Sequence, residues 1–164
     1  MVAVAVRLHT RCSEITNRET VIVLINHPKR AKQIISFEGM ERRRGIIPTD
    51  IDGFIDYKGG VFVYMEAKLV GADVPDGQRW ALENAVKSHD QVKGREGEKG
   101  HKACAILFRH NTNPEEDIIV KDQYVEKCYF KHNDTYKWWN YGKNTVSQFL
   151  DKWEGYCEKR GYDL

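Results

Sequence analysis

The stretch IIPTDIDGFIDYKGGVFVYMEAKLV, residues 46–70, contains two runs rich in β-branched and aromatic residues on either side of Lys58-Gly59-Gly60. Two such runs separated by a short turn with glycine predict a β-hairpin with strands over residues 46–57 and 61–70. A three-residue turn pairs Tyr57 with Val61, because glycine can adopt the left-handed conformation that such a turn requires. Counting back from that pair places Asp52 opposite Glu66.

The predicted hairpin gathers charged side chains on one face. Side chains alternate between the two faces of a strand, so Asp50, Asp52 and Asp56 share one face, and Glu66 shares a face with Lys68. Opposed residues have Cβ atoms about 5 Å apart, at which distance two carboxylates repel each other. A hard divalent cation with oxygen ligands would compensate both charges. The spacing alone leaves open an exposed polar hairpin with no metal.

Helical and strand patterns surround the hairpin. Pro28 is typical of a first helical position and Gly39 of a helix end, and apolar residues recur at helical spacing further along the chain. These patterns predict helices over residues 28–39, 78–89 and 145–159, and strands over 103–108, 118–125 and 127–131. The order of elements predicts an α/β fold, a single domain over residues 1–164, with a mixed central β-sheet flanked by helices.

Composition indicates an ordinary globular chain of 164 residues with 41% hydrophobic and 30% charged residues. The longest apolar runs fall far short of the roughly 20 residues that span a bilayer, and no signal peptide is visible. The four cysteines are far apart and form no C-x-x-C pair. We therefore expect a cytoplasmic protein that does not act on a membrane.

The acid on the first strand, Asp52, followed by the triplet Glu66-Ala67-Lys68 on the second, resembles the motif of the PD-(D/E)XK, or restriction-endonuclease-like, nucleases. Gln78, where the next helix is predicted to begin, is similar to a glutamine that many members add. Glu38, at the end of the preceding predicted helix, is similar to an additional acid that some members contribute. The resemblance covers residues 26–110 and implies a restriction-endonuclease-like core.

The resemblance implies a metal-dependent mechanism. Asp52 and Glu66 would hold Mg²⁺ or Mn²⁺, with the Ala67 carbonyl as a further ligand. Lys68 would orient the attacking water and offset charge on the phosphate, and Gln78 would position Lys68 or a phosphate oxygen. Asp50 lies on the same face as Asp52 and is an alternative ligand. The register argument favours Asp52, as does Gly53, which would allow close backbone approach.

The expected activity is that of an endodeoxyribonuclease that hydrolyses phosphodiester bonds in DNA. The resemblance implies that Arg79 and the basic corner Arg42-Arg43-Arg44 bind backbone phosphates, although charge alone favours a solvated surface for the basic corner. Two alternatives remain: a non-catalytic nucleic-acid-binding or assembly module on the same fold, and a nuclease that cleaves RNA. A homodimer is also compatible with the resemblance.

Aromatic residues gather near the C-terminal third of the chain. Trp138, Trp139 and Tyr141 could stack on exposed bases. We expect packing within the sheet instead, because aromatic residues are common in sheet cores. His110, which follows the predicted strand over residues 103–108, is expected to be a hydrogen-bonded polar residue and not a ligand.

Overall fold

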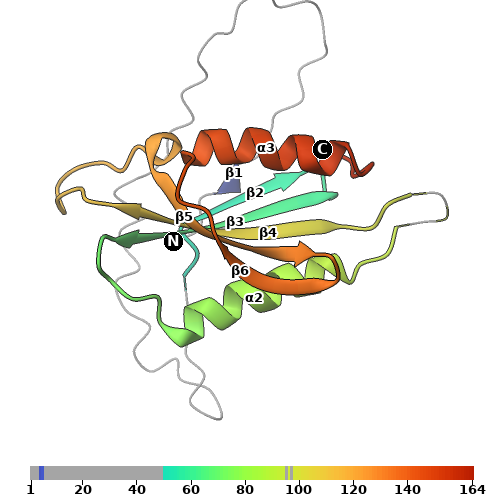
Figure 1. Ribbon diagram of the computed structural model, residues 1–164, viewed down its shortest axis with the longest axis horizontal. Coiled ribbons are helices and arrows are strands. Elements are labelled where there is room, and N and C mark those ends of the chain that lie inside the picture. Colours follow the sequence, from blue (N-terminus) through green and yellow to red (C-terminus); the bar gives the residue numbers. More distant parts are fainter. Residues whose placement is uncertain (1–3, 6–49, 95, 97) are drawn as a thin grey trace, which may run out of the picture.

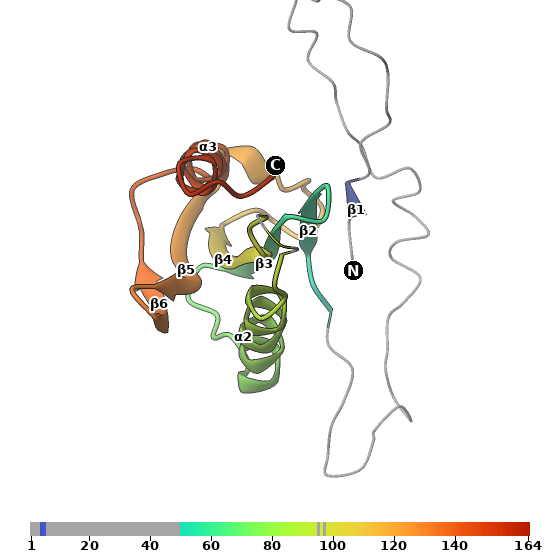
Figure 2. The ribbon, with the colours of Figure 1, turned by 90° about the vertical axis from the view of Figure 1, so that its right-hand side faces the viewer.

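The computed structural model describes residues 4–5, 50–94, 96 and 98–164. Within them lies a mixed β-sheet with strand order β1-β2-β3-β4-β5-β6, and helices α2 and α3 cover its opposite faces (Figures 1 and 2). The strands are β1 (Val4–Ala5), β2 (Gly53–Tyr57), β3 (Val61–Leu69), β4 (Lys102–His110), β5 (Tyr124–His132) and β6 (Thr135–Asn140). The helices are α2 (Asp76–Asp90), the short 3₁₀ helix η2 (Val120–Asp122) and α3 (Val146–Glu158). The predicted α/β class is confirmed.

The β2–β3 hairpin has the predicted register. Its antiparallel pairs run from Gly53 with Met65 to Tyr57 with Val61. Lys58 and Gly59 in the turn both have positive φ, at 51° and 83°, so the turn uses two left-handed residues. The first strand is shorter than predicted, since residues 50–52 precede it without strand pairing of their own. The rest of that prediction, residues 46–49, and the predicted helix over residues 28–39 lie outside the described residues.

Strand β3 lies inside the sheet, paired with β2 on one edge and parallel to β4 on the other, and helices α3 and α2 cover its two faces. Alternate residues of β3 therefore enter two separate cores. Val61 and Val63 pack on the α3 side with Phe149 and Trp153. The α2-side core contains Phe62, Tyr64, Leu82, Val86 and Tyr129. Glu66 and Lys68 continue the alternation of Phe62 and Tyr64, which assigns them to the α2 face.

The C-terminal part of the sheet differs from the prediction. Residues 118–125 do not form one strand, because η2 occupies Val120–Asp122 and β5 begins at Tyr124. Ile119 and Val120 are exposed, so these apolar residues do not enter the core. The predicted strand over residues 127–131 is part of β5. Strand β6 was missed, although Asn133 and Asp134, with φ of 47° and 62°, form the two-residue turn that joins it to β5.

Both predicted helices within the described residues are confirmed, with α2 longer by two residues at its start and one at its end, and α3 within the predicted range. Helix α2 packs on β3, β4 and β5, which brings its first turn close to the start of the hairpin. Among the described residues, no helix has both the length and the apolar character needed to cross a membrane.

Helix α3 begins with a capping box. The Thr145 hydroxyl accepts a hydrogen bond from the Gln148 backbone N–H at 3.3 Å, and the Gln148 side chain accepts one from the Thr145 N–H at 3.1 Å. We expect Thr145→Ala to lower the free energy of unfolding by about 1 kcal/mol, because a helix donor loses its partner. Urea denaturation measures this loss. Ser147→Ala at an exposed neighbouring position is the control, and equal losses in both variants would contradict the prediction.

Candidate functional site

Asp52 lies at the point where the β2–β3 hairpin opens. It occupies the position immediately before Gly53, whose partner is Met65, so the next position on the opposite strand is Glu66. The Asp52 carboxylate accepts a hydrogen bond from the Ala67 backbone N–H at 2.8 Å. This bond holds the exposed Asp52 against β3, and the structure thereby brings Asp52 beside Glu66.

Glu66 is a buried acid with an ammonium neighbour. Its side chain is 1% exposed, and Lys68 Nζ lies 2.6 Å from Oε1. Burial raises the pKa of Glu66 from 4.5 to about 7; the contact with Lys68 lowers it, and the charges of Asp52 and Asp50 raise it. The other oxygen, Oε2, accepts no hydrogen bond from the described residues. A buried carboxylate with a free oxygen is costly unless a cation or a proton compensates it.

The first turn of α2 adds an amide to the same place. Gln78 Nε2 donates a hydrogen bond to Asp50 Oδ1 at 3.1 Å. Its carbonyl oxygen, Oε1, is buried and accepts no hydrogen bond from the described part of the chain. Asp50 therefore positions Gln78, and the Gln78 carbonyl oxygen stays available to accept a hydrogen bond. Asp50 and Asp52 have different partners, Gln78 and the Ala67 N–H, respectively.

The donor set suits a hard cation bound in part by water. Among the described residues, no three His, Cys, Asp or Glu side chains are grouped to hold a metal ion. Mg²⁺, however, is commonly bound through one or two carboxylates, with waters and substrate phosphates completing its shell. Asp52 and the free oxygen of Glu66 match that pattern. The Ala67 carbonyl stays a predicted third ligand.

The predicted phosphate-binding residues are only partly described. Arg79 lies one residue after Gln78 in α2 and is 44% exposed, with Asp76 at 2.8 Å and Glu83 at 3.9 Å as its carboxylate neighbours. It can therefore exchange a surface ion pair for a phosphate. Glu38 and the corner Arg42-Arg43-Arg44 lie outside the described residues.

Arg109 is a functional candidate that the sequence analysis missed. It pairs with Lys68 in the parallel β3–β4 register, so the two side chains lie on the same face, one strand apart. Its guanidinium forms an ion pair with Glu126 and donates hydrogen bonds to the Leu69 and Ala72 carbonyls. Strand alternation through the buried run of β4 would have placed Arg109 on this face. Its partner Glu126 was not predictable, because it lies at a bulge between β4 and β5.

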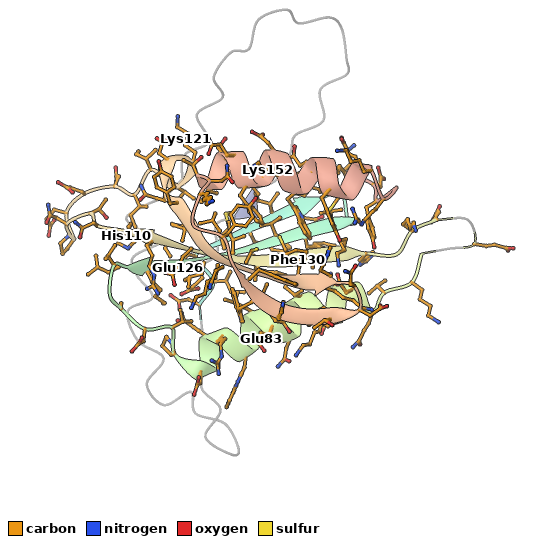
Figure 3. All side chains as sticks on the ribbon, in the orientation of Figure 1. Glu83, His110, Lys121, Glu126, Phe130 and Lys152 are labelled. Atoms are coloured by element: carbon orange, nitrogen blue, oxygen red, sulfur yellow. The ribbon has the colours of Figure 1, made fainter. Side chains whose placement is uncertain are left out.

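His110 is hydrogen-bonded, as expected, and Trp139 and Tyr141 pack against the core on the α3 side. His110, at the end of β4 (Figure 3), has Nδ1 2.8 Å from the Thr112 hydroxyl. Trp139 packs beside Phe130 on the α3 side, and Tyr141 contacts Phe149. Trp138 faces the other way, with its ring 5.3 Å from that of Tyr129 on the α2 side.

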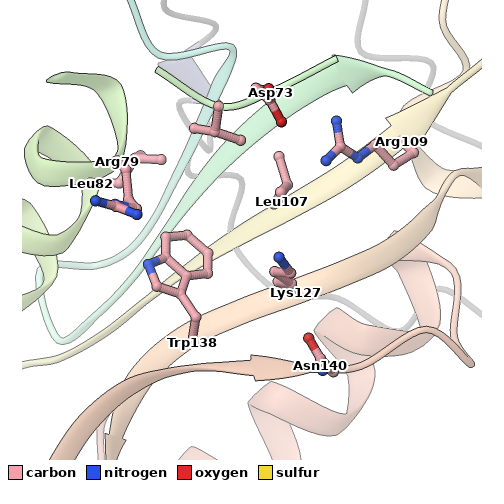
Figure 4. Close-up of a pocket in the computed structure, with 9 residues that line it drawn as sticks. Asp73, Arg79, Leu82, Leu107, Arg109, Lys127, Trp138 and Asn140 are labelled. Atoms are coloured by element: carbon pink, nitrogen blue, oxygen red, sulfur yellow. The ribbon is translucent and has the colours of Figure 1, made fainter. Parts of the chain in front are cut away.

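A cavity of about 400 Å³ adjoins the carboxylate site on the α2 face (Figure 4). It lies between α2 and strands β4, β5 and β6, and Leu107, the partner of Glu66 in the β3–β4 register, forms part of its wall. The lining residues are Asp73, Val74, Arg79, Leu82, Leu107, Arg109, Lys127, Trp138 and Asn140. The cavity therefore lies on the same face of the sheet as Glu66 and Lys68, one strand away.

The site thus combines two neighbouring carboxylates, one of them buried, with a lysine, a positioned glutamine and a cationic cavity next to them. Comparison of the chain with protein-family models, curated proteins and solved structures found no match to any of the three, so the functional argument rests on this geometry.

Proposed function

We propose that this protein is a Mg²⁺- or Mn²⁺-dependent endonuclease that hydrolyses phosphodiester bonds in DNA. The observation that supports the proposal best is the environment of Glu66. It is buried, its Oε2 accepts no hydrogen bond from the described residues, and its charged neighbours are the ammonium of Lys68 and the carboxylate of Asp52. A purely structural ion pair would gain from satisfying both oxygens, whereas a ligand for a cation needs one oxygen free.

The fold is compatible with this proposal. A hairpin that carries Asp52 and the Glu66-Ala67-Lys68 triplet is followed by a helix and then by a strand parallel to β3. The same order is expected of a PD-(D/E)XK core. That likeness is an analogy of fold and motif, so the side chains of the site carry the functional argument.

Each side chain has a role that its position supports. Asp52 and Glu66 would hold the metal ion, which when bound polarises the phosphate and lowers the pKa of a water molecule. Lys68, held beside Glu66, would orient the attacking water and offset negative charge that develops on the phosphate. Gln78 would direct its free carbonyl oxygen towards the Lys68 ammonium or the water. Arg79 would bind a backbone phosphate and carry no sequence information.

The proposal is tested by incubating the purified chain with single-stranded, duplex and branched DNA and with RNA, in Mg²⁺, Mn²⁺ or EDTA. We expect cleavage of at least one DNA substrate with either metal and none with EDTA. Cleavage of RNA but of no DNA substrate would show that the enzyme is a ribonuclease. Binding without cleavage on every substrate would overturn the catalytic proposal in favour of a non-catalytic binding module.

A further inference from the structure

The cavity beside the candidate site combines a flat aromatic wall with cations. Trp138 projects from β6 into the space between Arg79 on α2 and Lys127 on β5 (Figure 4). Leu82 and Leu107 form an apolar floor, and Asn140 adds an amide. A volume of about 400 Å³ lies within the range of pockets that hold small organic ligands.

Trp138 is fixed before any ligand binds. Its indole N–H donates a hydrogen bond of 2.8 Å to Glu83 Oε1, which ties β6 to α2. Glu83 in turn has Arg79 and Lys87 at 3.9 and 4.0 Å, so its charge is shared with two cations. A ring held in this way offers a stacking surface with little loss of rotamer freedom on binding.

Cations outnumber carboxylates among the residues that line the cavity, although Arg79 is paired with Asp76 and lies near Glu83. The lining contains three cations against one carboxylate: Arg79, Arg109 and Lys127 against Asp73. Glu126 is the described counter-ion of two of these cations, since it pairs with Arg109 and lies 3.6 Å from Lys127 Nζ. One carboxylate cannot neutralise both, and Lys127 is 43% exposed. A phosphate group would therefore be attracted to this position.

The cavity lies one strand away from the carboxylate site. Leu107 and Arg109 of its wall pair with Glu66 and Lys68 across the β3–β4 ladder, and neighbouring strands lie about 4.8 Å apart. A nucleic-acid strand with its phosphate at Glu66 would therefore place the next nucleotide against the cavity. A base in a duplex is stacked and paired, so its flat faces are not accessible to Trp138.

We propose that this cavity receives an unpaired nucleotide adjoining the bond to be cleaved, with its base against Trp138 and its phosphate against Lys127 and Arg79. The inference rests on the proposed nuclease function and narrows its substrate to DNA that is single-stranded or locally unpaired at the site. Asn140 would contact the edge of the base. Stacking on one aromatic ring tolerates every base, so we expect a preference for structure and little preference for sequence.

The test follows the indole N–H resonances of the four tryptophans by NMR in EDTA, where cleavage is absent. The probe is a short single-stranded DNA oligonucleotide, compared with its blunt duplex and with inorganic phosphate. We expect the Trp138 signal, assigned with Trp138→Phe, to shift with the single strand only. Trp139, on the opposite face of the same strand, is the internal control.

Variants measure the contribution of each wall. Trp138→Leu should weaken binding of the single strand about tenfold, whereas Trp138→Phe should retain most of the affinity. Lys127→Ala, at a position that is 43% exposed, should weaken binding of the single strand several-fold. Equal shifts with duplex and single strand, or the same shift with inorganic phosphate, would overturn the pocket proposal even if the protein cleaves DNA. A Trp138 shift in a protein that never cleaves would instead overturn the nuclease proposal alone.

Discussion

Lys68→Ala should lower the rate of metal-dependent DNA cleavage by about a hundred- to a thousand-fold, the usual effect of removing one group that stabilises charge in a transition state. Lys68 forms an ion pair with the buried carboxylate, with Nζ 2.6 Å from Glu66 Oε1. Without it, negative charge that develops on the phosphate loses its neighbouring ammonium. Single-turnover cleavage with saturating enzyme measures the chemical step apart from substrate binding.

Folding should survive this change, because Glu66 can take up a proton. The pKa of Glu66 is already about 7. The contact with Lys68 lowers this pKa, so loss of Lys68 should raise it further. The protonated carboxyl avoids the full cost of an unpaired buried charge. Circular dichroism and thermal melting check this point.

Lys152→Ala is the matched control for Lys68→Ala, because Lys152 lies on α3 on the opposite face of the sheet (Figure 3). Its ammonium donates a hydrogen bond to Asn144 Oδ1 at 2.9 Å. The Lys152→Ala variant should cleave DNA at the wild-type rate. A folded Lys68→Ala protein that also cleaves at that rate would remove Lys68 from the proposed mechanism.

The hairpin register was predictable because local chemistry determines it. Glycines in Lys58-Gly59-Gly60 allow a three-residue turn, and strand alternation then assigns each side chain to a face. The same two rules place Asp52 next to Glu66. They cannot show that Glu66 is 1% exposed, because burial depends on which elements cover the sheet.

The contacts of the cavity residues Arg109 and Trp138 were not predictable in the same way. Glu126 lies at an irregularity between β4 and β5, where alternation fails, and its pairing with Arg109 follows from that bulge. The role of Trp138 depends on its contact with Glu83, a residue 55 positions earlier in the chain. Contacts of this kind come from tertiary packing and leave no local pattern.

The change Glu66→Gln should make the metal-free protein more stable than wild type above about pH 7, and should abolish cleavage. The pKa of Glu66 is about 7 in the folded protein against an ordinary 4.5, so the folded state holds a proton that the unfolded state releases between these values. Wild-type stability must therefore fall as pH rises through that interval and level off above about 7. At about 1.4 kcal/mol per pH unit, the interval corresponds to about 3 kcal/mol.

Glutamine has nearly the shape of glutamate and no charge to desolvate, so the variant should lack this dependence. The difference in free energy of unfolding between the two proteins, measured by urea denaturation in EDTA, should grow from about pH 4.5 to about 7 by up to about 3 kcal/mol. Loss of the contact with Lys68 reduces the net gain. A difference that stays constant with pH would show that Glu66 is ionised normally in the folded protein.

If Glu66 is a metal ligand, Mg²⁺ should make the wild-type protein more stable than Glu66→Gln, the reverse of the order expected without metal. An ion that binds the folded state stabilises it by mass action, and it needs the ionised carboxylate, so wild type should gain stability from Mg²⁺ at about pH 8 and gain less at about pH 6. Glu66→Gln should gain little at either pH. Asp122→Asn, at an exposed acid remote from Glu66 in sequence, is the control and should respond as wild type does. Equal stabilisation of wild type and Glu66→Gln by Mg²⁺ would mean that the buried carboxylate is compensated by its proton and by Lys68, and that any metal binds elsewhere.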